Sequence, residues 1–180
     1  MHNAYFQVEL VTHFNQIRHQ LPDPGHITVL HLAAEQLGVA SGSGMGPPET
    51  QILALGAQRS AREYFTLTPP GRREFELAIE RVEDEIIRAS KLLPLQAKLY
   101  SNDQLVRQIA LLAGVPDGAL MLFDLETMER CFSRLAAVIQ GQPAAQEGIP
   151  LDNNFAAALL ILREFMHHLG FSSICILRGV

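Results

Sequence analysis

The stretch LDNNFAAALLILREFMHHL, residues 151–169, determines the fold expected for this chain. Its eight consecutive apolar residues, Phe155 to Leu162, contain no glycine or proline, and Asp152 or Asn153 can cap the start of a helix. A helix with apolar side chains on nearly all sides needs neighbours on more than one side. The stretch therefore predicts a buried helix at the centre of the core.

Helical periodicity also appears along most of the preceding chain, between segments rich in glycine and proline. It predicts helices over residues 3–20, 27–37, 49–65, 68–93, 101–113 and 124–139, with the fourth ending near Pro94. Three short apolar runs are compatible with strands. The run ITVLHL at 27–32 favours a helix but suits a strand equally well, the run at 120–125 is ambiguous, and 172–177 has the pattern of a strand.

These elements predict a mainly α fold, a compact domain of about six or seven helices around the buried C-terminal helix. A short extended tail would follow and could form a small sheet. The length of 180 residues fits a single domain over 1–180, and the run SGSGMGPP at 41–48 is expected to be a flexible loop within it.

Composition excludes several classes of protein. The apolar share of 48% and the charged share of 18% are typical of a globular chain. A net charge of −5 argues against partners bound through clustered positive charge, so neither nucleic acid nor a membrane surface is expected. The first ten residues lack the pattern of a secretory signal, and the cysteines, Cys131 and Cys175, have no metal-binding spacing. A cytoplasmic location is therefore expected.

The strongest candidate for chemistry is the group Glu164, His167 and His168 in the last turns of the buried helix. Spacings of three and four residues place both imidazoles beside one carboxylate, which is how helices present ligands to iron, manganese or zinc. A transition metal is therefore a possible cofactor. The alternative is that Glu164 pairs with a neighbouring cation while His168 stabilises the negative end of the helix.

Further ligands for such a site would come from elsewhere in the chain. Glu9, His13 and His31 are of the right type, although an inward-facing histidine is more often a satisfied core residue. Two other patterns are weaker. The arginines near residues 59–73 could receive an anion but alternate with glutamates, and the segment 106–123 resembles a helix-turn-helix but lacks side chains able to contact bases.

The absence of a strong catalytic motif favours a non-catalytic binding or accessory protein that acts through a protein partner or self-association, for example as a homodimer. One alternative is a metal-dependent enzyme or sensor with its site at Glu164, His167 and His168. The other alternative is a small-molecule carrier whose apolar pocket would be lined by Met121, Phe123, Met128, Phe132 and Met166.

Overall fold

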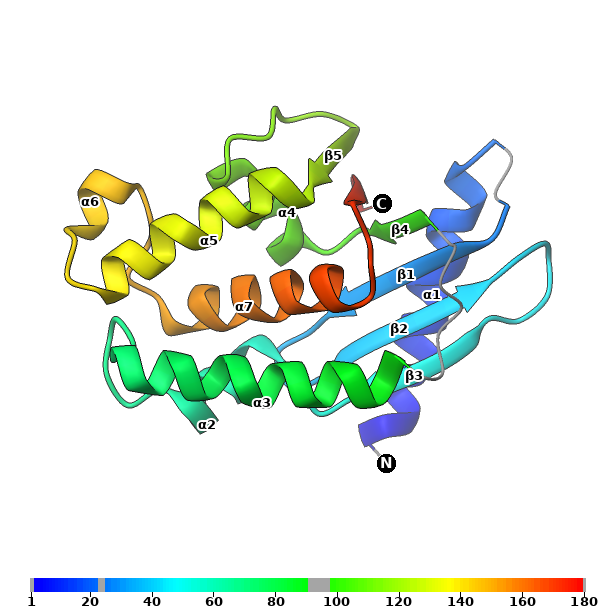
Figure 1. The fold of residues 1–180 in the computed structure, drawn as a ribbon. Helices are drawn as coiled ribbons and strands as arrows, with labels where there is room; N and C mark the ends of the chain where they lie inside the picture. The colour runs from blue at the N-terminus through cyan, green and yellow to red at the C-terminus, as the bar shows by residue number, and fades with distance from the viewer. Residues whose placement is uncertain (1, 23–24, 91–97, 180) are drawn as a thin grey trace.

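The computed structural model describes residues 2–22, 25–90 and 98–179, and a six-stranded mixed sheet lies at its centre (Figure 1). The strand order is β3-β2-β1-β4-β6-β5. The strands are β1 Ile27–Leu32, β2 Leu37–Gly42, β3 Glu49–Leu53, β4 Lys98–Ser101, β5 Leu120–Asp124 and β6 Ser173–Leu177. Because β1, β4 and β6 run parallel to one another, their carboxyl ends meet at the same end of the sheet, the usual place for ligands in open α/β sheets.

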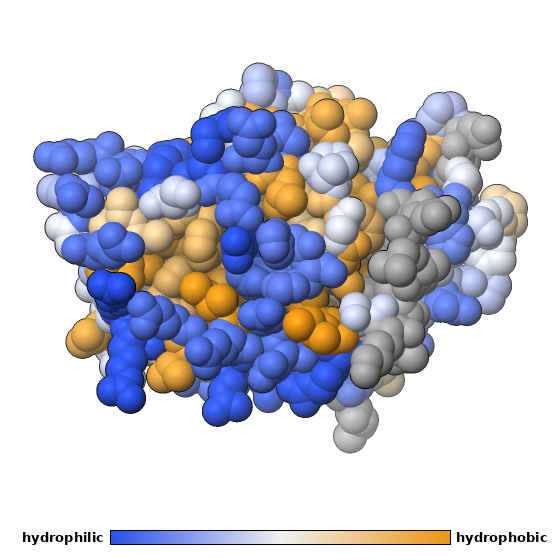
Figure 2. All heavy atoms as spheres, viewed as in Figure 1, coloured by the Kyte–Doolittle hydropathy of each residue, from blue (hydrophilic) through white to orange (hydrophobic). Residues whose placement is uncertain are grey.

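The described helices cover both faces of this sheet. They are α1 His2–Gln20, α2 Ala57–Tyr64, α3 Arg72–Ser90, α4 Gln104–Leu112, α5 Leu125–Ile139, α6 Ala144–Glu147 and α7 Asn153–His168. Helix α1 packs on one face, and α3, α5 and α7 form a layer over the other (Figure 1). Figure 2 views that second layer, where hydrophilic side chains follow the outer sides of α3 and α5 and apolar side chains appear between them.

Strand β1 divides its side chains between the two faces, as the two-residue period of a strand requires. Val29 belongs to the core cluster under α1, whereas Leu30 and Leu32 belong to the larger cluster under α7. His31 therefore points to the α1 side, where its ring stacks on that of Phe6 with centroids 5.1 Å apart. Every residue of β1 is buried.

Glycine at position 38 brings α1 close to the sheet. Gly38 is the register partner of His31 on the neighbouring strand β2. A Cβ atom at this position would lie 3.0 Å from side-chain atoms of Leu10 and Phe6, closer than ordinary packing allows. The absence of a side chain at Gly38 thus lets α1 lie directly against β2, next to His31.

Helix α7 is buried as the sequence predicts. All residues from Phe155 to Leu162 are buried, and the Asp152 side chain caps the helix by accepting a hydrogen bond from the Asn154 N–H. The helix contacts α2, α3, α4 and α5. Burial on several sides explains why its apolar residues extend around the helix.

The mainly α fold class is wrong, because the sheet and not a helix bundle organises the molecule. Residues 27–32 form strand β1, which is buried on both faces, so its side chains do not show the alternation of apolar and polar residues that marks a half-exposed strand. Residues 49–53 form strand β3 and not the start of a helix, because half-exposed polar side chains at this sheet edge hide the strand pattern. The ambiguous runs are strands β5 and β6, and β4 lies where no strand is predicted. The helix end predicted near Pro94 lies outside the described residues.

The fold bears on the expected self-association and on membrane spanning. Strand β6, formed by the tail, is paired on both sides, so the open edges of the described sheet belong to β3 and β5. Self-association remains a prediction. Within the described ranges, no helix has the length and apolar character needed to span a membrane.

Candidate functional site

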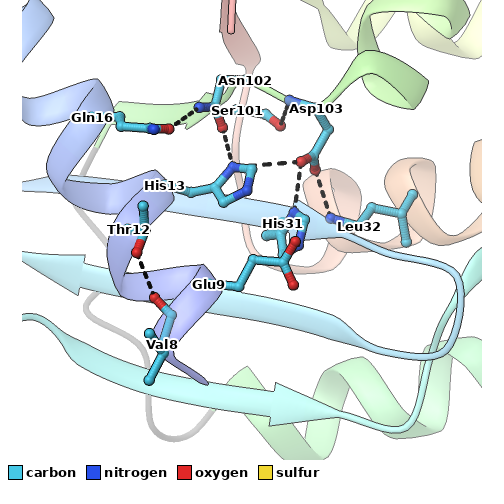
Figure 3. Close-up of polar contacts among 10 residues, drawn as sticks. All are labelled: Val8, Glu9, Thr12, His13, Gln16, His31, Leu32, Ser101, Asn102 and Asp103. Atoms are coloured by element: carbon cyan, nitrogen blue, oxygen red, sulfur yellow. Dashed lines mark hydrogen bonds and ion pairs between the residues drawn. The ribbon is translucent and has the colours of Figure 1, made fainter. Parts of the chain in front are cut away.

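A cluster of polar side chains lies where β1 and β4 end, beneath α1 (Figure 3). Helix α1 contributes Glu9 and His13, β1 contributes His31, and the residues directly after β4 are Asn102 and Asp103. Parallel pairing of β1 and β4 brings these segments together although they are far apart in the sequence. The cluster therefore occupies the carboxyl-end position that the topology favours for a ligand.

His31 is anchored through one ring nitrogen. Its Nδ1 lies 2.6 Å from Oδ1 of Asp103, and the second carboxylate oxygen of Asp103 accepts a hydrogen bond of 2.7 Å from the Leu32 N–H. A carboxylate can only accept, so the proton of this contact belongs to Nδ1 of His31. Asp103 is itself buried, and its N–H donates to Oγ of Ser101. The imidazole is thus held in one orientation with Nε2 facing the other members of the cluster.

The Nε2 atom of His31 is buried and has no hydrogen-bond partner among the described residues. Its nearest carboxylate oxygen, Oε1 of Glu9, lies 3.6 Å away, beyond hydrogen-bond distance. Leaving such a group unsatisfied costs about 1–3 kcal/mol. Burial lowers the pKa of His31, but the hydrogen bond and charge of Asp103, together with the charge of Glu9, outweigh it and raise that pKa. The atom is therefore suited to accept a proton or a positive ion.

His13 repeats this arrangement beside His31. Its Nδ1 lies 2.5 Å from Oδ1 of Asn102, whose amide nitrogen donates to Oε1 of Gln16. The donation to Gln16 fixes the orientation of the amide, so its oxygen faces His13 and accepts from Nδ1. The two imidazoles stack with centroids 4.2 Å apart. Glu9, His13 and His31 each offer one ligand atom, and these atoms all lie within 4.8 Å of one another.

The charge of the cluster is negative unless a histidine is protonated. Among the described residues, the ion-pair partners of Glu9 and Asp103 are His13 and His31, and no arginine or lysine joins them. Glu9 is half exposed, with 55% of its side chain accessible, whereas His31 and Asp103 are buried. The arrangement is thus a buried His–Asp pair that solvent reaches from the Glu9 side, without a resident cation.

The predicted metal site lies on the other face of the sheet. Glu164 is buried in α7, where it accepts from Nη1 of Arg163 at 2.5 Å and contacts Nε2 of His168 at 3.0 Å. His167 points instead toward Glu129, with Nδ1 and Oε1 3.9 Å apart. The structure brings Glu164 and His168 together but adds an arginine to them. Metal binding by Glu164, His167 and His168 remains a prediction.

The weaker sequence patterns have structural explanations. Arg62 forms a two-pronged pair with Glu35, and Arg59 and Arg72 each pair with the glutamate four residues later. The five residues proposed for an apolar carrier pocket belong to the main core or pack against it: Met121, Phe123, Met128, Phe132 and Met166. They are explained by ordinary core packing.

Sequence reasoning missed the acceptors that orient the two histidines. Asn102 and Asp103 follow a strand of four residues, KLYS, which is too short to stand out in the sequence. A carboxylate and an amide placed directly after a strand are a usable signal for a site at a sheet edge. The signal required recognising β4, and the sequence predicted at most a small sheet at the tail and not the six-stranded sheet.

Comparison with solved structures shows that the fold is similar to that of proteins described as Ppx/GppA phosphatases. No protein-family model matches the sequence, and no curated protein matches it. The Ppx/GppA phosphatase of Aquifex aeolicus, type II variant, shares the fold with a TM-score of 0.72 at 14% identity, over 89% of this chain and 55% of that one. An exopolyphosphatase from Cytophaga hutchinsonii gives a TM-score of 0.71 at 11% identity, over 94% of this chain and 58% of that one.

At such identities the similarity shows the fold alone, and this chain spans little more than half the length of either protein. The mixed sheet overturns the expectation of a mainly helical protein. The neighbours with this fold are described as phosphatases, so they do not favour the expected non-catalytic accessory role. Of the interpretations drawn from the sequence, the metal-dependent enzyme agrees better with this fold.

Proposed function

We propose that the protein is a hydrolase of phosphate ester or phosphoanhydride bonds, with its centre at Glu9, His13, His31 and Asp103. The observation that carries the proposal is the buried Nε2 of His31, which has no hydrogen-bond partner among the described residues while Asp103 holds the opposite side of the ring. A buried imidazole with one nitrogen anchored and the other available is a common arrangement for activating water.

The location of the cluster supports the proposal. It lies at the carboxyl ends of adjacent parallel strands, where open sheets of this kind bind ligands. The similarity to phosphatases, two of which are described as an exopolyphosphatase or exopolyphosphatase-like protein, makes phosphate compounds the first substrates to test. Inorganic polyphosphate is the leading candidate within that class.

The cluster can activate water in two ways. His31 can take a proton from water through Nε2, with Asp103 stabilising the imidazolium that forms. Alternatively, a metal ion held by the imidazoles can bind the water and increase its acidity. Without a metal ion, the negative charges of Glu9 and Asp103 would lie uncompensated beside a phosphate anion. The electrostatics of the site therefore favour activation of water by a bound metal ion.

The amino terminus of α2 could also attract a phosphate group, but its N–H groups already have hydrogen-bond partners within the protein. The first N–H groups of α2 donate to backbone carbonyls of the β1–β2 turn, from Ala57 to Ala33 and from Gln58 and Arg59 to Ala34. These groups would otherwise offer a helix terminus to an anion. The turn therefore occupies the α2 terminus, which cannot also hold a substrate.

Release of inorganic phosphate from polyphosphate and from p-nitrophenyl phosphate, with Mg²⁺, Mn²⁺ or Zn²⁺ added in turn, tests the proposal. We expect turnover that His31→Ala and Asp103→Asn reduce by at least about 100-fold, the lower range for loss of a catalytic acid–base group. The matched control is His19→Ala, an exposed histidine on the same helix as His13. Phosphate release at the level of the buffer blank under all three metals, or equal release by the His31→Ala variant, would reject the function.

A further inference from the structure

Three potential ligands surround one point in the cluster described above, and their neighbours prepare them for a positive ion. We propose that Glu9, His13 and His31 bind one divalent transition-metal ion of the Zn²⁺ type, with Asn102 and Asp103 as outer partners of the two imidazoles. The inference deepens the proposed function and rests on it for the ion's role in hydrolysis. Metal binding itself is argued from the geometry.

Both histidines present the same nitrogen to the proposed ion. Nδ1 of His31 donates to Asp103 and Nδ1 of His13 donates to Asn102, so in the neutral rings the lone pair lies on Nε2. Histidine ligands in metal sites typically donate their other N–H to a carboxylate or carbonyl oxygen, which sets the tautomer and increases the basicity of the ligand. Here two consecutive residues, Asn102 and Asp103, each hold the Nδ1 of one imidazole. A single buried histidine in a core would need only one such acceptor.

The burial of His31 supports the proposed metal site independently of the ring orientations. His31 is only 6% exposed, and its Nε2 is directed toward Glu9 without a bond to any described residue. A structural histidine in a core usually has both nitrogens satisfied. An ion bound between Nε2 and Glu9 would satisfy the nitrogen and compensate the carboxylates of Glu9 and Asp103, which no arginine or lysine of the described chain accompanies.

The type of ion follows from the donor atoms. Two imidazoles and one carboxylate suit Zn²⁺ or a similar transition metal, whereas Mg²⁺ and Ca²⁺ prefer oxygen ligands throughout. Bonds of about 2.0–2.1 Å at tetrahedral angles would place the ligand atoms about 3.3 Å apart. They now lie within 4.8 Å of one another, with Nε2 of His31 and Oε1 of Glu9 3.6 Å apart, so at least one ligand side chain would move closer when an ion binds.

Three protein ligands leave one position of a tetrahedral ion open, as in catalytic zinc sites. Because the Glu9 side chain is 55% exposed, we expect that position to face solvent, where water or a phosphate oxygen could reach it. The ion would also supply the positive charge that this acidic cluster lacks for an anionic substrate. Metal binding and phosphate hydrolysis would then be properties of the same site.

Metal binding can be measured without any activity. The protein is freed of metal with a chelator and titrated with Zn²⁺ by calorimetry, and the Co²⁺ form is examined for the visible absorption of a tetrahedral site. We expect the protein to bind one equivalent of Zn²⁺. His13→Ala or His31→Ala removes a ligand, so each should lower the Zn²⁺ affinity by more than the factor of about 10 to 100 expected for loss of an outer partner. Glu9→Gln changes an exposed side chain, so it tests the site even if a buried histidine variant fails to fold.

Controls separate this site from its alternatives. His19→Ala, on the same helix, should bind the ion like the unmodified protein, and so should His167→Ala and His168→Ala. Absence of stoichiometric Zn²⁺ binding, or binding that His168→Ala abolishes and Glu9→Gln leaves intact, would overturn the inference. Binding without phosphate release would support the metal site and reject the proposed function. Release that persists after chelation would support the proposed function and reject the ion's role in hydrolysis.

Discussion

Two clusters of histidine and carboxylate lie on opposite faces of the same sheet, and they differ in one respect. Around Glu164, the buried carboxylate already has a permanent cation, because Arg163 donates to it and His168 contacts its other oxygen. Around His31, the buried imidazole has an anchored Nδ1 and an unbonded Nε2, and neither nearby carboxylate pairs with an arginine or lysine of the described chain.

We propose that the resident arginine is what distinguishes the Glu164 cluster from the His31 cluster as a place for a ligand. Arg163 lies between Glu164 and Glu129, and although burial lowers its pKa, the hydrogen bonds and charges of these two carboxylates raise it overall. The arginine therefore stays charged and competes with any metal for the same oxygens. In the His31 cluster that competition is limited to protons.

Replacing the buried carboxylate of the α7 cluster should have the largest effect on stability. Glu164→Ala removes charge-assisted contacts to Arg163 and His168, while Glu129 still pairs with Arg163. We expect the free energy of unfolding to fall by about 2–3 kcal/mol, measured by urea denaturation. Zn²⁺ affinity should be unchanged, and loss of metal binding in this variant would reverse the assignment of roles to the two clusters.

Asp103→Asn should affect the other cluster through the orientation of His31. The amide keeps an oxygen for the Leu32 N–H but no longer offers a charged acceptor to Nδ1 of His31. We expect Zn²⁺ affinity to fall by about 10- to 100-fold, equivalent to about 1.4–2.7 kcal/mol. Calorimetric titration measures the change. Unchanged affinity together with reduced stability would show that Asp103 has only a structural role.

Gly38→Ala tests whether the close approach of α1 matters to the cluster that it covers. The added Cβ would lie 3.0 Å from side-chain atoms of Leu10 and Phe6, so these side chains, or α1 with Glu9 and His13, must move by a few tenths of an ångström. We expect a loss of about 1–2 kcal/mol in thermal unfolding experiments and weaker Zn²⁺ binding. Gly46→Ala is the matched control, because a Cβ there meets nothing within 4 Å. Equal behaviour of the two variants would contradict the explanation.

His167→Ala should have the smallest effect. The side chain is 50% exposed and lies 3.9 Å from the nearest carboxylate oxygen, a distance and exposure at which an ion pair contributes little. We expect a change in stability below about 0.5 kcal/mol and no change in bound metal. Loss of a bound ion, measured by elemental analysis, would support the metal site predicted at Glu164, His167 and His168.

Local sequence patterns were sufficient for most helices. The predictions for α1, α4, α5 and the buried α7 are confirmed, because three- and four-residue spacing and capping residues are properties of a single segment. Asp124 illustrates this, since it stands at the predicted start of this helix and its side chain caps α5 by accepting from the Thr127 N–H. Strands were predicted poorly, because β1 is covered on both faces and β3 is a polar edge, so neither has alternating hydrophobicity.

For the candidate site, too, the sequence predicted local features and missed the contacts between distant segments. The sequence by itself placed Glu164, His167 and His168 beside one another on a helix, and offered Glu9, His13 and His31 only as further ligands for that site. Only the tertiary structure decided that Glu9 and His13 lie next to His31, and that Asn102 and Asp103 orient the two imidazole rings. It also decided that Glu164 accepts a hydrogen bond from Arg163. The physical reason is that helix spacing acts over a few residues, whereas parallel strand pairing joins segments about seventy residues apart, and single-segment periodicity carries no record of that pairing.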